Sequence, residues 1–234
     1  MSITELSGID KYILYWFNGS NSLFEDGLVS LLTSGMTWIP LYIALFYLVM
    51  KNNDTMGQIM LIVGSIILCI ILTGGIDDIF IKPWIGRVRP CNDPDINAHL
   101  NLITGQVESG FSFFSAHAAN TMSLAVFLCL LIKDSIFKIV MIGWSLLNGW
   151  SRLYLGVHFP SDVLFGFLYG AVIGILIFSF YKRFYSEMSF QTTYISSQYT
   201  SSGYERKDID VVLVVFLLTT LTTSIISFLN VGLF

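Results

Sequence analysis

Residues 55–76, TMGQIMLIVGSIILCIILTGGI, form a stretch without any Asp, Glu, Lys or Arg. A bilayer core is about 30 Å thick, and about 20 consecutive apolar residues cross it as a helix. Charge-free stretches of comparable length cover residues 27–50, 163–181 and 211–234. A soluble chain has no use for so many long apolar stretches, so the sequence predicts a protein embedded in a membrane.

The composition supports the same conclusion. Hydrophobic residues make up 54% of the chain and charged residues only 12%, whereas about 25% of a typical soluble domain is charged. Too few charged groups remain to cover a globular surface. Because lipid offers backbone polar groups no water, each membrane segment must satisfy them internally, and we therefore expect an all-α fold.

Two further segments contain polar or charged residues near one end but are otherwise apolar, and they complete a helical bundle. Residues 115–132 begin with Ser-Ala-His and then continue apolar, and residues 139–155 are uncharged apart from Arg152. A short Lys-Asp-Ser turn separates them, as in a helical hairpin. We therefore predict a polytopic membrane protein with six transmembrane helices in one domain, residues 1–234.

The ends of the chain differ from the core, residues 26–182. Residues 183–208 are expected to form an inner linker, of which 188–204 is uncharged and rich in Ser, Thr, Gln and Tyr, before a last helix at 209–234. Residues 1–25 suit an N-terminal interfacial helix, with apolar residues on one face and polar residues between them. A flexible tail is the alternative. The residues of the expected apolar face are Ile9, Ile13, Leu14, Trp16 and Phe17.

Lys and Arg residues in the loops predict the orientation, since they favour the cytoplasmic side. With six helices, the expected cytoplasmic face carries Lys51, Lys133, Lys138, Lys182, Arg183, Arg206 and Lys207. The opposite face carries Lys11, Lys82, Arg87, Arg89 and Arg152. All of these except the first lie in the motifs described next. We therefore predict an integral plasma (inner) membrane protein whose motifs and termini face the periplasm or exterior.

Three short segments near that outer face carry the charged and nucleophilic residues: 82–90, 114–117 and 151–162. Ionisable groups at membrane helix ends are costly unless they are paired or functional. Arg binds phosphate through bidentate hydrogen bonds, Lys adds a point charge, and the free amides that open a helix favour an anion. The segments therefore predict a phosphate site. The residues expected to bind the phosphate are Lys82, Arg89, Ser115, Ala116 and Arg152.

His158 and Asp162 are four residues apart at the start of a predicted helix, where their side chains can meet. The carboxylate then fixes the imidazole tautomer and frees the other nitrogen, which can attack phosphorus and form a phosphohistidine. His117 is left to protonate the leaving oxygen and then to activate water. Two alternatives stay open here: a zinc site made by these three residues, and a serine-hydrolase triad that uses Ser115.

In the order and spacing of these segments, the chain resembles the type 2 phosphatidic acid phosphatase superfamily. Residues 82–90 match its first signature, which is a lysine, six residues and an arginine-proline pair. Residues 151–162 match its third signature in every fixed position. Residues 114–117 read Phe-Ser-Ala-His where the second signature usually reads Pro-Ser-Gly-His, so the serine and histidine are kept.

The resemblance implies a metal-independent lipid phosphatase with a six-helix core and no cofactor. It also implies that His158 is the nucleophile and His117 the acid. The expected partners are a lipid phosphate substrate and membrane lipids, without nucleic acid. Candidate substrates are undecaprenyl diphosphate, phosphatidylglycerol phosphate, phosphatidic acid and lipid A phosphate. An anion or phospholipid transporter that uses the same cationic site without chemistry is the alternative function.

Residues around the motifs lead to smaller expectations. Arg87 is interpreted either as an ordinary interfacial residue or as part of the site. The aspartate pair 77–78 is expected to balance the nearby cations rather than to hold a metal ion. Cys91 is expected at the outer mouth of the site, where cations would favour its thiolate. The loop 91–114 is expected to cover the site, and its acidic residues, Glu108 among them, to disfavour extra headgroup charge.

Overall fold

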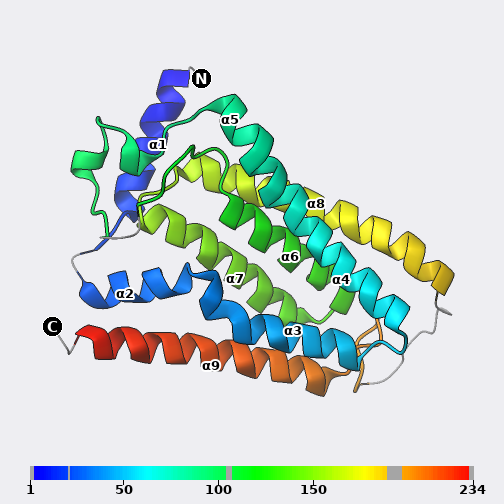
Figure 1. The fold of residues 1–234 in the computed structure, drawn as a ribbon. Helices are drawn as coiled ribbons and strands as arrows, with labels where there is room; N and C mark the ends of the chain where they lie inside the picture. The colour runs from blue at the N-terminus through cyan, green and yellow to red at the C-terminus, as the bar shows by residue number, and fades with distance from the viewer. Residues whose placement is uncertain (1–2, 21, 104–106, 189–196, 232–234) are drawn as a thin grey trace.

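The computed structural model describes residues 3–20, 22–103, 107–188 and 197–231. Within these ranges the chain is helical and has no strand, only two isolated bridges, which confirms the all-α prediction. Residues 189–196 of the expected linker and the last three residues of the expected last helix lie outside the described residues. The helices are α1 (Ile3–Phe17), α2 (Leu23–Leu32), α3 (Ile39–Lys51), α4 (Met56–Ile70), α5 (Lys82–Ile85), α6 (Ala116–Ile132), α7 (Ser135–Tyr154), α8 (Pro160–Met188) and α9 (Arg206–Val231) (Figure 1).

The described helices are those of a membrane protein. Met56–Ile85, Pro160–Tyr185 and Arg206–Val231 are long and apolar enough to cross a bilayer, and Leu23–Leu32 with Gly35–Lys51 adds a fourth crossing if this bent pair forms one span. α6 is apolar and has 17 residues. α7 has 20 residues and buries several polar side chains inside the bundle. All six predicted segments are therefore helical, while the count of six crossings stays a prediction.

The first predicted span, residues 27–50, is not one straight helix. α2 ends at Leu32, a tight turn covers Gly35–Trp38, and the chain bends there by 66° before α3. The turn is held by the indole of Trp38, whose Nε1 donates to the Leu32 carbonyl at 2.8 Å. A proline follows in the first turn of α3, where its missing N–H costs no helical hydrogen bond. The prediction of an unbroken helix is therefore wrong.

The second predicted span continues further than expected. α4 passes through two π-helical segments, Ile71–Gly75 and Asp77–Ile81, and joins α5. Backbone groups that such turns release within a membrane need new partners, and the Leu72 carbonyl accepts a hydrogen bond from Tyr169 Oη at 3.0 Å. The extension carries Lys82 beyond the apolar stretch, to the end of the bundle where the other motif residues lie.

α8 packs against α6 through a row of glycines. Gly166, Gly170 and Gly174 are spaced four residues apart, so they share one face of α8. A Cβ atom added at Gly170 would lie 2.3 Å from the Ala119 carbonyl oxygen, and one at Gly166 would lie 2.7 Å from that of Ser115. Small residues let two helix backbones approach this closely. The contact therefore brings the first turn of α6 beside the first turn of α8.

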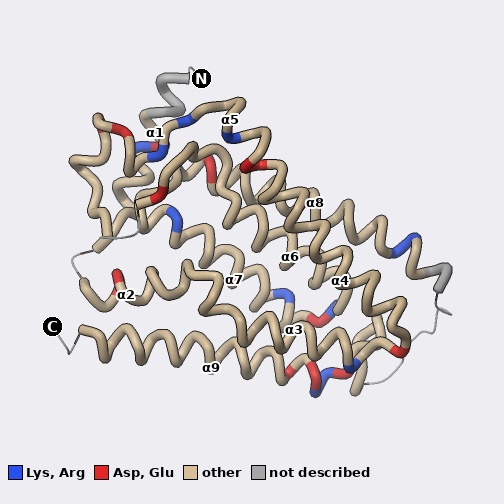
Figure 2. Tube along the Cα trace, viewed as in Figure 1, with Lys and Arg blue, Asp and Glu red and all other residues tan. Residues whose placement is uncertain are grey.

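Charged residues gather towards the two ends of the bundle, and the middle stretches of α8 and α9 carry none (Figure 2). α9 starts at one end, where Arg206 lies 3.7 Å from Asp134. It packs along α3 and α2, and Ser227 near its other end donates to the Phe24 carbonyl at 2.6 Å. The loops that carry the expected cytoplasmic cations therefore lie at one end of the bundle, and the three motif segments lie at the other.

α1 docks onto the end that carries the motif segments. Among residues 8–18, whose exposure the structure describes, Asp10 and Leu14 of α1 and Asn18 just after it are buried, and their spacing of four residues places them on one face. Leu14 joins an apolar cluster at the start of α8, and Asn18 Nδ2 donates to the last carbonyl of α7 at 2.8 Å. Ile9 and Trp16 of the predicted apolar face are exposed. The predicted helix is present. Ile13 and Phe17 are half-buried, and exposed apolar side chains are what a helix at the membrane interface presents to lipid, so the interfacial placement stays a prediction.

Gly170→Val tests the contact between α6 and α8. The added side chain would overlap the α6 backbone, so we expect a loss of stability of about 1–3 kcal/mol or more, the usual cost of overpacking. Thermal unfolding of the purified protein in detergent measures it. The matched control is Gly64→Val in α4, where an added Cβ has no atom within 4 Å and little change is expected. Equal stability of the two variants would contradict the packing described.

Candidate active site

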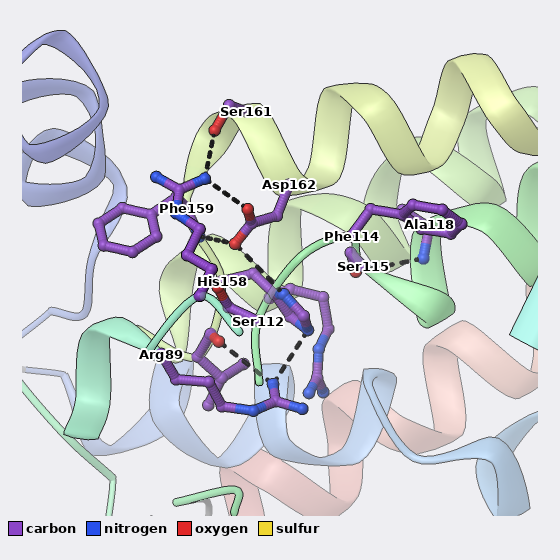
Figure 3. A network of polar contacts seen from close by, with 12 residues as sticks. Arg89, Ser112, Phe114, Ser115, Ala118, His158, Phe159, Ser161 and Asp162 are labelled. Atoms are coloured by element: carbon purple, nitrogen blue, oxygen red, sulfur yellow. Dashed lines mark hydrogen bonds and ion pairs between the residues drawn. The ribbon is translucent and has the colours of Figure 1, made fainter. Parts of the chain in front are cut away.

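The first turns of α6 and α8 meet through a backbone hydrogen bond. The N–H of Ser115, which caps α6, donates to the Asp162 carbonyl at 3.1 Å. The N–H of Phe114 donates to Asp77 Oδ1 at 3.3 Å, which ties the π-helical segment Asp77–Ile81 to the same place. Side chains from the predicted segments therefore converge at one end of the bundle (Figure 3).

His158 and Asp162 face each other, as the spacing predicts, and both are buried (Figure 3). Asp162 Oδ2 lies 3.6 Å from His158 Nδ1, beyond hydrogen-bond distance, and it accepts from the Phe159 N–H at 2.9 Å. The other oxygen, Oδ1, accepts from Arg87 Nη1 at 2.6 Å. Catalytic hydrogen bonds are often this long in a site without substrate, and a shift of about 0.5 Å would close this one.

The contacts of His158 determine which ring nitrogen carries the proton. Arg89 Nη1 lies 3.1 Å from His158 Nε2, and a guanidinium can only donate. This contact favours the tautomer in which Nε2 is the acceptor and Nδ1, the nitrogen that faces Asp162, carries the proton. In this tautomer the lone pair of Nε2 points at a cation and can reach an electrophile held by that cation.

The surroundings of His158 also keep its imidazole neutral. Burial lowers the pKa of His158 to about 4, with a further contribution from Arg152 and Arg89, and the nearby Asp162 only partly opposes them. Only the neutral ring has a free lone pair. A histidine with this pKa is therefore ready to act as a nucleophile at neutral pH, without first losing a proton.

A carboxylate bridges the two buried arginines next to His158. Glu108 Oε2 lies 2.9 Å from Arg89 Nη1, and its Oε1 pairs with Arg152 Nη2. Burial raises the pKa of Glu108, but Arg152 and Arg89 outweigh that effect and hold the pKa at about 2. The two guanidinium groups therefore already bind an oxyanion where the sequence predicts phosphate. Sequence reasoning missed this contact because a charge in a loop does not reveal which way its side chain points.

Arg152 is fixed from a second side by the break between α2 and α3. Its Nη1 donates to Thr33 Oγ1 at 2.9 Å, and Ser151 Oγ donates to the same hydroxyl oxygen at 3.2 Å. The Arg152 side chain is only 2% exposed. Thr33 was not predicted, although a signal was present, since it opens a Thr-Ser-Gly run of the kind that favours a turn.

Lys82 is buried beside two aspartates. Its Nζ lies 3.1 Å from Asp77 Oδ2 and 2.6 Å from Asp78 Oδ1, which confirms that the aspartate pair balances charge. Lys82 is also close enough to His117 to act on it electrostatically. The structure therefore places Lys82 at the edge of the site near α6, paired with carboxylates and apart from the Glu108 bridge.

The N-terminus of α6 supplies backbone amides to the site. Ser115 Oγ accepts from the Ala118 N–H at 3.5 Å, and its own N–H is engaged by α8. The first N–H groups of a helix lack partners within the helix, which leaves those of Ala116 and His117 to a ligand. The His117 imidazole is half-buried and close enough to Arg152 to interact with its charge. Ser115 thus holds the helix in place, and the next two residues carry the expected anion-binding amides.

Arg87 belongs to the site and is not an ordinary interfacial residue. Its guanidinium pairs with Asp162 and, through Nη2, with Asp10 of α1 at 2.7 Å. Sequence reasoning missed Asp10 because the prediction for this helix used only its apolar residues. The spacing of Asp10, Leu14 and Asn18, four residues apart, was a signal of a shared face, but two of the three are polar.

Cys91 is buried, so the expectation of an exposed, reactive thiolate is wrong. Its side chain packs with Tyr154 and Leu155 beneath the loop. Burial raises the pKa of the Cys91 thiol, and neighbouring Arg89 offsets only part of this. Arg89 already forms an ion pair with Glu108, so its positive charge stabilises a thiolate at Cys91 only weakly.

The two alternative chemistries gain no support from the geometry. Within the described part of the chain, no three His, Cys, Asp or Glu side chains are grouped so as to hold a metal ion. A serine-hydrolase triad needs a serine hydroxyl hydrogen-bonded to a histidine. Ser115 is fully buried, and its hydroxyl caps α6 instead.

Comparison with known proteins identifies relatives over most of the chain. It is 35% identical over 174 residues to a lipid A 4'-phosphatase of Bacteroides thetaiotaomicron, a match that covers 74% of this chain and 77% of that protein. A lipid A 4'-phosphatase of Porphyromonas gingivalis is 25% identical over 173 residues, covering 74% and 73%. A phosphatidylglycerophosphatase B of Bacillus subtilis is 35% identical over 129 residues, covering 51% and 59%.

The fold has a solved counterpart as well. The crystal structure of a transmembrane PAP2-type phosphatidylglycerolphosphate phosphatase from Bacillus subtilis matches with a TM-score of 0.58, covering 79% of this chain and 88% of that one at 24% identity. Residues 58–186, which contain all three motif segments, match the PAP2 superfamily. The chain therefore belongs to the PAP2 superfamily and is an integral-membrane phosphatase.

Proposed function

We propose that this phosphatase hydrolyses a phosphate monoester or diphosphate on a membrane lipid through a phosphohistidine at His158. The observation that carries the proposal is the arginine pair Arg89 and Arg152, which binds the Glu108 carboxylate beside His158, whose Nε2 lies 3.1 Å from Arg89 Nη1. An oxyanion binds there already, and a substrate phosphate that replaced it would lie next to the nucleophile.

In the first step, the phosphate displaces Glu108 and binds to Arg89, Arg152 and the amides at the start of α6. His158 Nε2 attacks phosphorus, the bond from phosphorus to the lipid oxygen breaks, and His117 gives that oxygen a proton. The proton on Nδ1 is held by Asp162, which stabilises the charge that develops on the ring. Cations that contact the equatorial oxygens stabilise the transition state, as in other phosphoryl transfers.

In the second step, a water molecule attacks the phosphohistidine. His117 now takes a proton from that water, the bond between phosphorus and His158 Nε2 breaks, and inorganic phosphate leaves. Neither step needs a metal ion, because Lys82, Arg89 and Arg152 supply the positive charge that metals provide elsewhere.

A cavity supports a lipid as the substrate. It has a volume of about 390 Å³ and lies among α3, α4, α6 and α7, with mainly apolar walls. Asn120 and Thr121, on the turn of α6 that follows His117, form part of its lining. Exposed Tyr42 and Phe46 of α3 also line it. An acyl chain in this cavity would leave its phosphate close to the start of α6.

The relatives favour a phosphorylated lipid of the cell envelope. Two of them are lipid A 4'-phosphatases that match 74% of this chain, and another is a phosphatidylglycerophosphatase. We therefore rank the lipid A 4'-phosphate first and phosphatidylglycerol phosphate second. Undecaprenyl diphosphate and phosphatidic acid remain candidates with the same chemistry. The distribution of basic loop residues supports a site on the outer side of the plasma (inner) membrane.

The test is phosphate release from purified protein in detergent, with those four lipid phosphates and a chelator present. We expect release from at least one lipid, with lipid A fastest. His158→Ala should abolish it, because no other group replaces the nucleophile. His99→Ala, in the exposed part of the loop, should keep the parental rate. Release that depends on added metal, or that survives in His158→Ala, would contradict the mechanism.

Glu108→Gln tests whether the carboxylate and the phosphate compete for one place. The substitution keeps the shape but removes the charge, so phosphate no longer displaces an ion-paired group. We expect the inhibition constants of inorganic phosphate and vanadate to fall about tenfold, since hydrogen bonds to charged groups contribute about 1.5–3 kcal/mol. Asp95→Asn, an exposed acid of the same loop, is the control and should leave them unchanged. Weaker inhibition of Glu108→Gln would show that Glu108 helps to bind the anion.

A further inference from the structure

The Arg87 guanidinium is enclosed by the first turn of α8 and by α1. Its Nη1 donates to Asp162 Oδ1 at 2.6 Å and to Ser161 Oγ at 2.7 Å, and its Nη2 donates to Asp10 Oδ2 at 2.7 Å. The group also lies over the Phe159 ring, 4.0 Å from its centre. Both terminal nitrogens are therefore engaged with carboxylates, and none of these contacts involves the Glu108 bridge.

Asp10 fixes the other side of this arrangement. It is only 6% exposed. Its Oδ1 accepts from the Ser161 N–H at 3.0 Å, and its Oδ2 accepts from the Ser161 hydroxyl at 2.5 Å as well as from Arg87. A buried carboxylate is costly unless it is paired and hydrogen-bonded, and these contacts satisfy that need. Asp10 therefore ties α1 to the first turn of α8 and to Arg87.

We propose that Asp10 and Arg87 are positioning residues, which act through Asp162 to orient His158. The inference rests on the proposed nucleophilic role of His158. Asp162 is held at Oδ1 by Arg87 and at Oδ2 by the Phe159 N–H, so rotation of its carboxylate would break a hydrogen bond at each oxygen. In this orientation Oδ2 lies 3.6 Å from His158 Nδ1, where a small shift during the reaction brings it into hydrogen-bond distance. Without Arg87, the carboxylate is free to turn away, and the ring loses the carboxylate that stabilises its developing charge.

Two arginines with different roles thus stand two residues apart. Arg89 contacts His158 Nε2 and Glu108, on the side of the imidazole where the phosphate binds. Arg87 contacts Asp162, which faces the opposite nitrogen, Nδ1. Removing Arg89 should weaken the binding of an anion, whereas removing Arg87 should slow the chemical step without affecting that binding. α1, which lies outside all three motif segments, then helps to position His158.

The experiment compares Arg87→Gln, Asp10→Asn and Arg89→Gln in detergent. It uses the lipid phosphate that the parent protein turns over fastest, with vanadate as inhibitor. For Arg87→Gln and Asp10→Asn we expect kcat to fall about tenfold or more, as when an orienting partner is removed from other sites. Their KM and vanadate inhibition constants should stay within about twofold of the parent. Arg89→Gln should weaken vanadate inhibition by about tenfold, the effect of losing one charge-assisted hydrogen bond.

A double variant and folding controls complete the test. Because both residues act through Asp162, Asp10→Asn with Arg87→Gln should lose no more kcat than Arg87→Gln alone. Thermal unfolding checks that each variant is folded before its rate is compared with that of the parent. If Arg87→Gln does not fold, the kcat, KM and vanadate inhibition constant of Asp10→Asn decide between the outcomes. Unchanged kcat, or vanadate inhibition weakened as in Arg89→Gln, would overturn the inference. A parent protein that releases no phosphate, or an active His158→Ala, would instead overturn the proposed function.

Discussion

Two guanidinium groups, those of Arg89 and Arg152, are buried at one end of an apolar helical bundle, and everything around them follows from that constraint. A buried cation is tolerated only beside an anion. In the structure Glu108 is that anion, and it bridges both groups. The bridging carboxylate sits in a loop and not in the bundle core, and we propose that the substrate phosphate replaces it. The burial that makes the arginines costly also lowers the pKa of His158, so the same environment suits both the proposed anion site and the proposed nucleophile.

The helices are arranged so that these groups meet. The glycines of α8 let its backbone lie against α6, which brings the amides of one helix start next to the carboxylate of the other. The bend after α2 presents Thr33 to Arg152, and the extension of α4 carries Lys82 to the same end. α1 contributes Asp10, which pairs with Arg87. Features that look irregular in a membrane bundle, a broken helix and π-helical turns, thus each contribute a side chain to the site.

Much of this could be predicted from sequence, and the exceptions have physical reasons. Uncharged stretches predicted the helices, and the spacing of His158 and Asp162 predicted their contact, because both depend on local helical periodicity. Glu108 and Asp10 were missed, since their partners are distant in sequence and a lone carboxylate has no local pattern. The bend at residues 33–38 was missed because the span was predicted from the absence of charge alone, and the Thr-Ser-Gly run that favours a turn there is uncharged. Cys91 was misplaced because proximity to cations in sequence does not reveal burial.

The central claim is that His158 forms a covalent bond to phosphorus, and the bound intermediate can be measured directly. Purified protein is mixed with lipid carrying a radiolabelled phosphate and quenched in alkali during turnover, and the labelled peptide is then mapped. The account predicts label on His158 that survives base and is lost in acid, with none on His158→Ala. Rapid phosphate release without any protein-bound label, or label on His117 or Ser115, would contradict it.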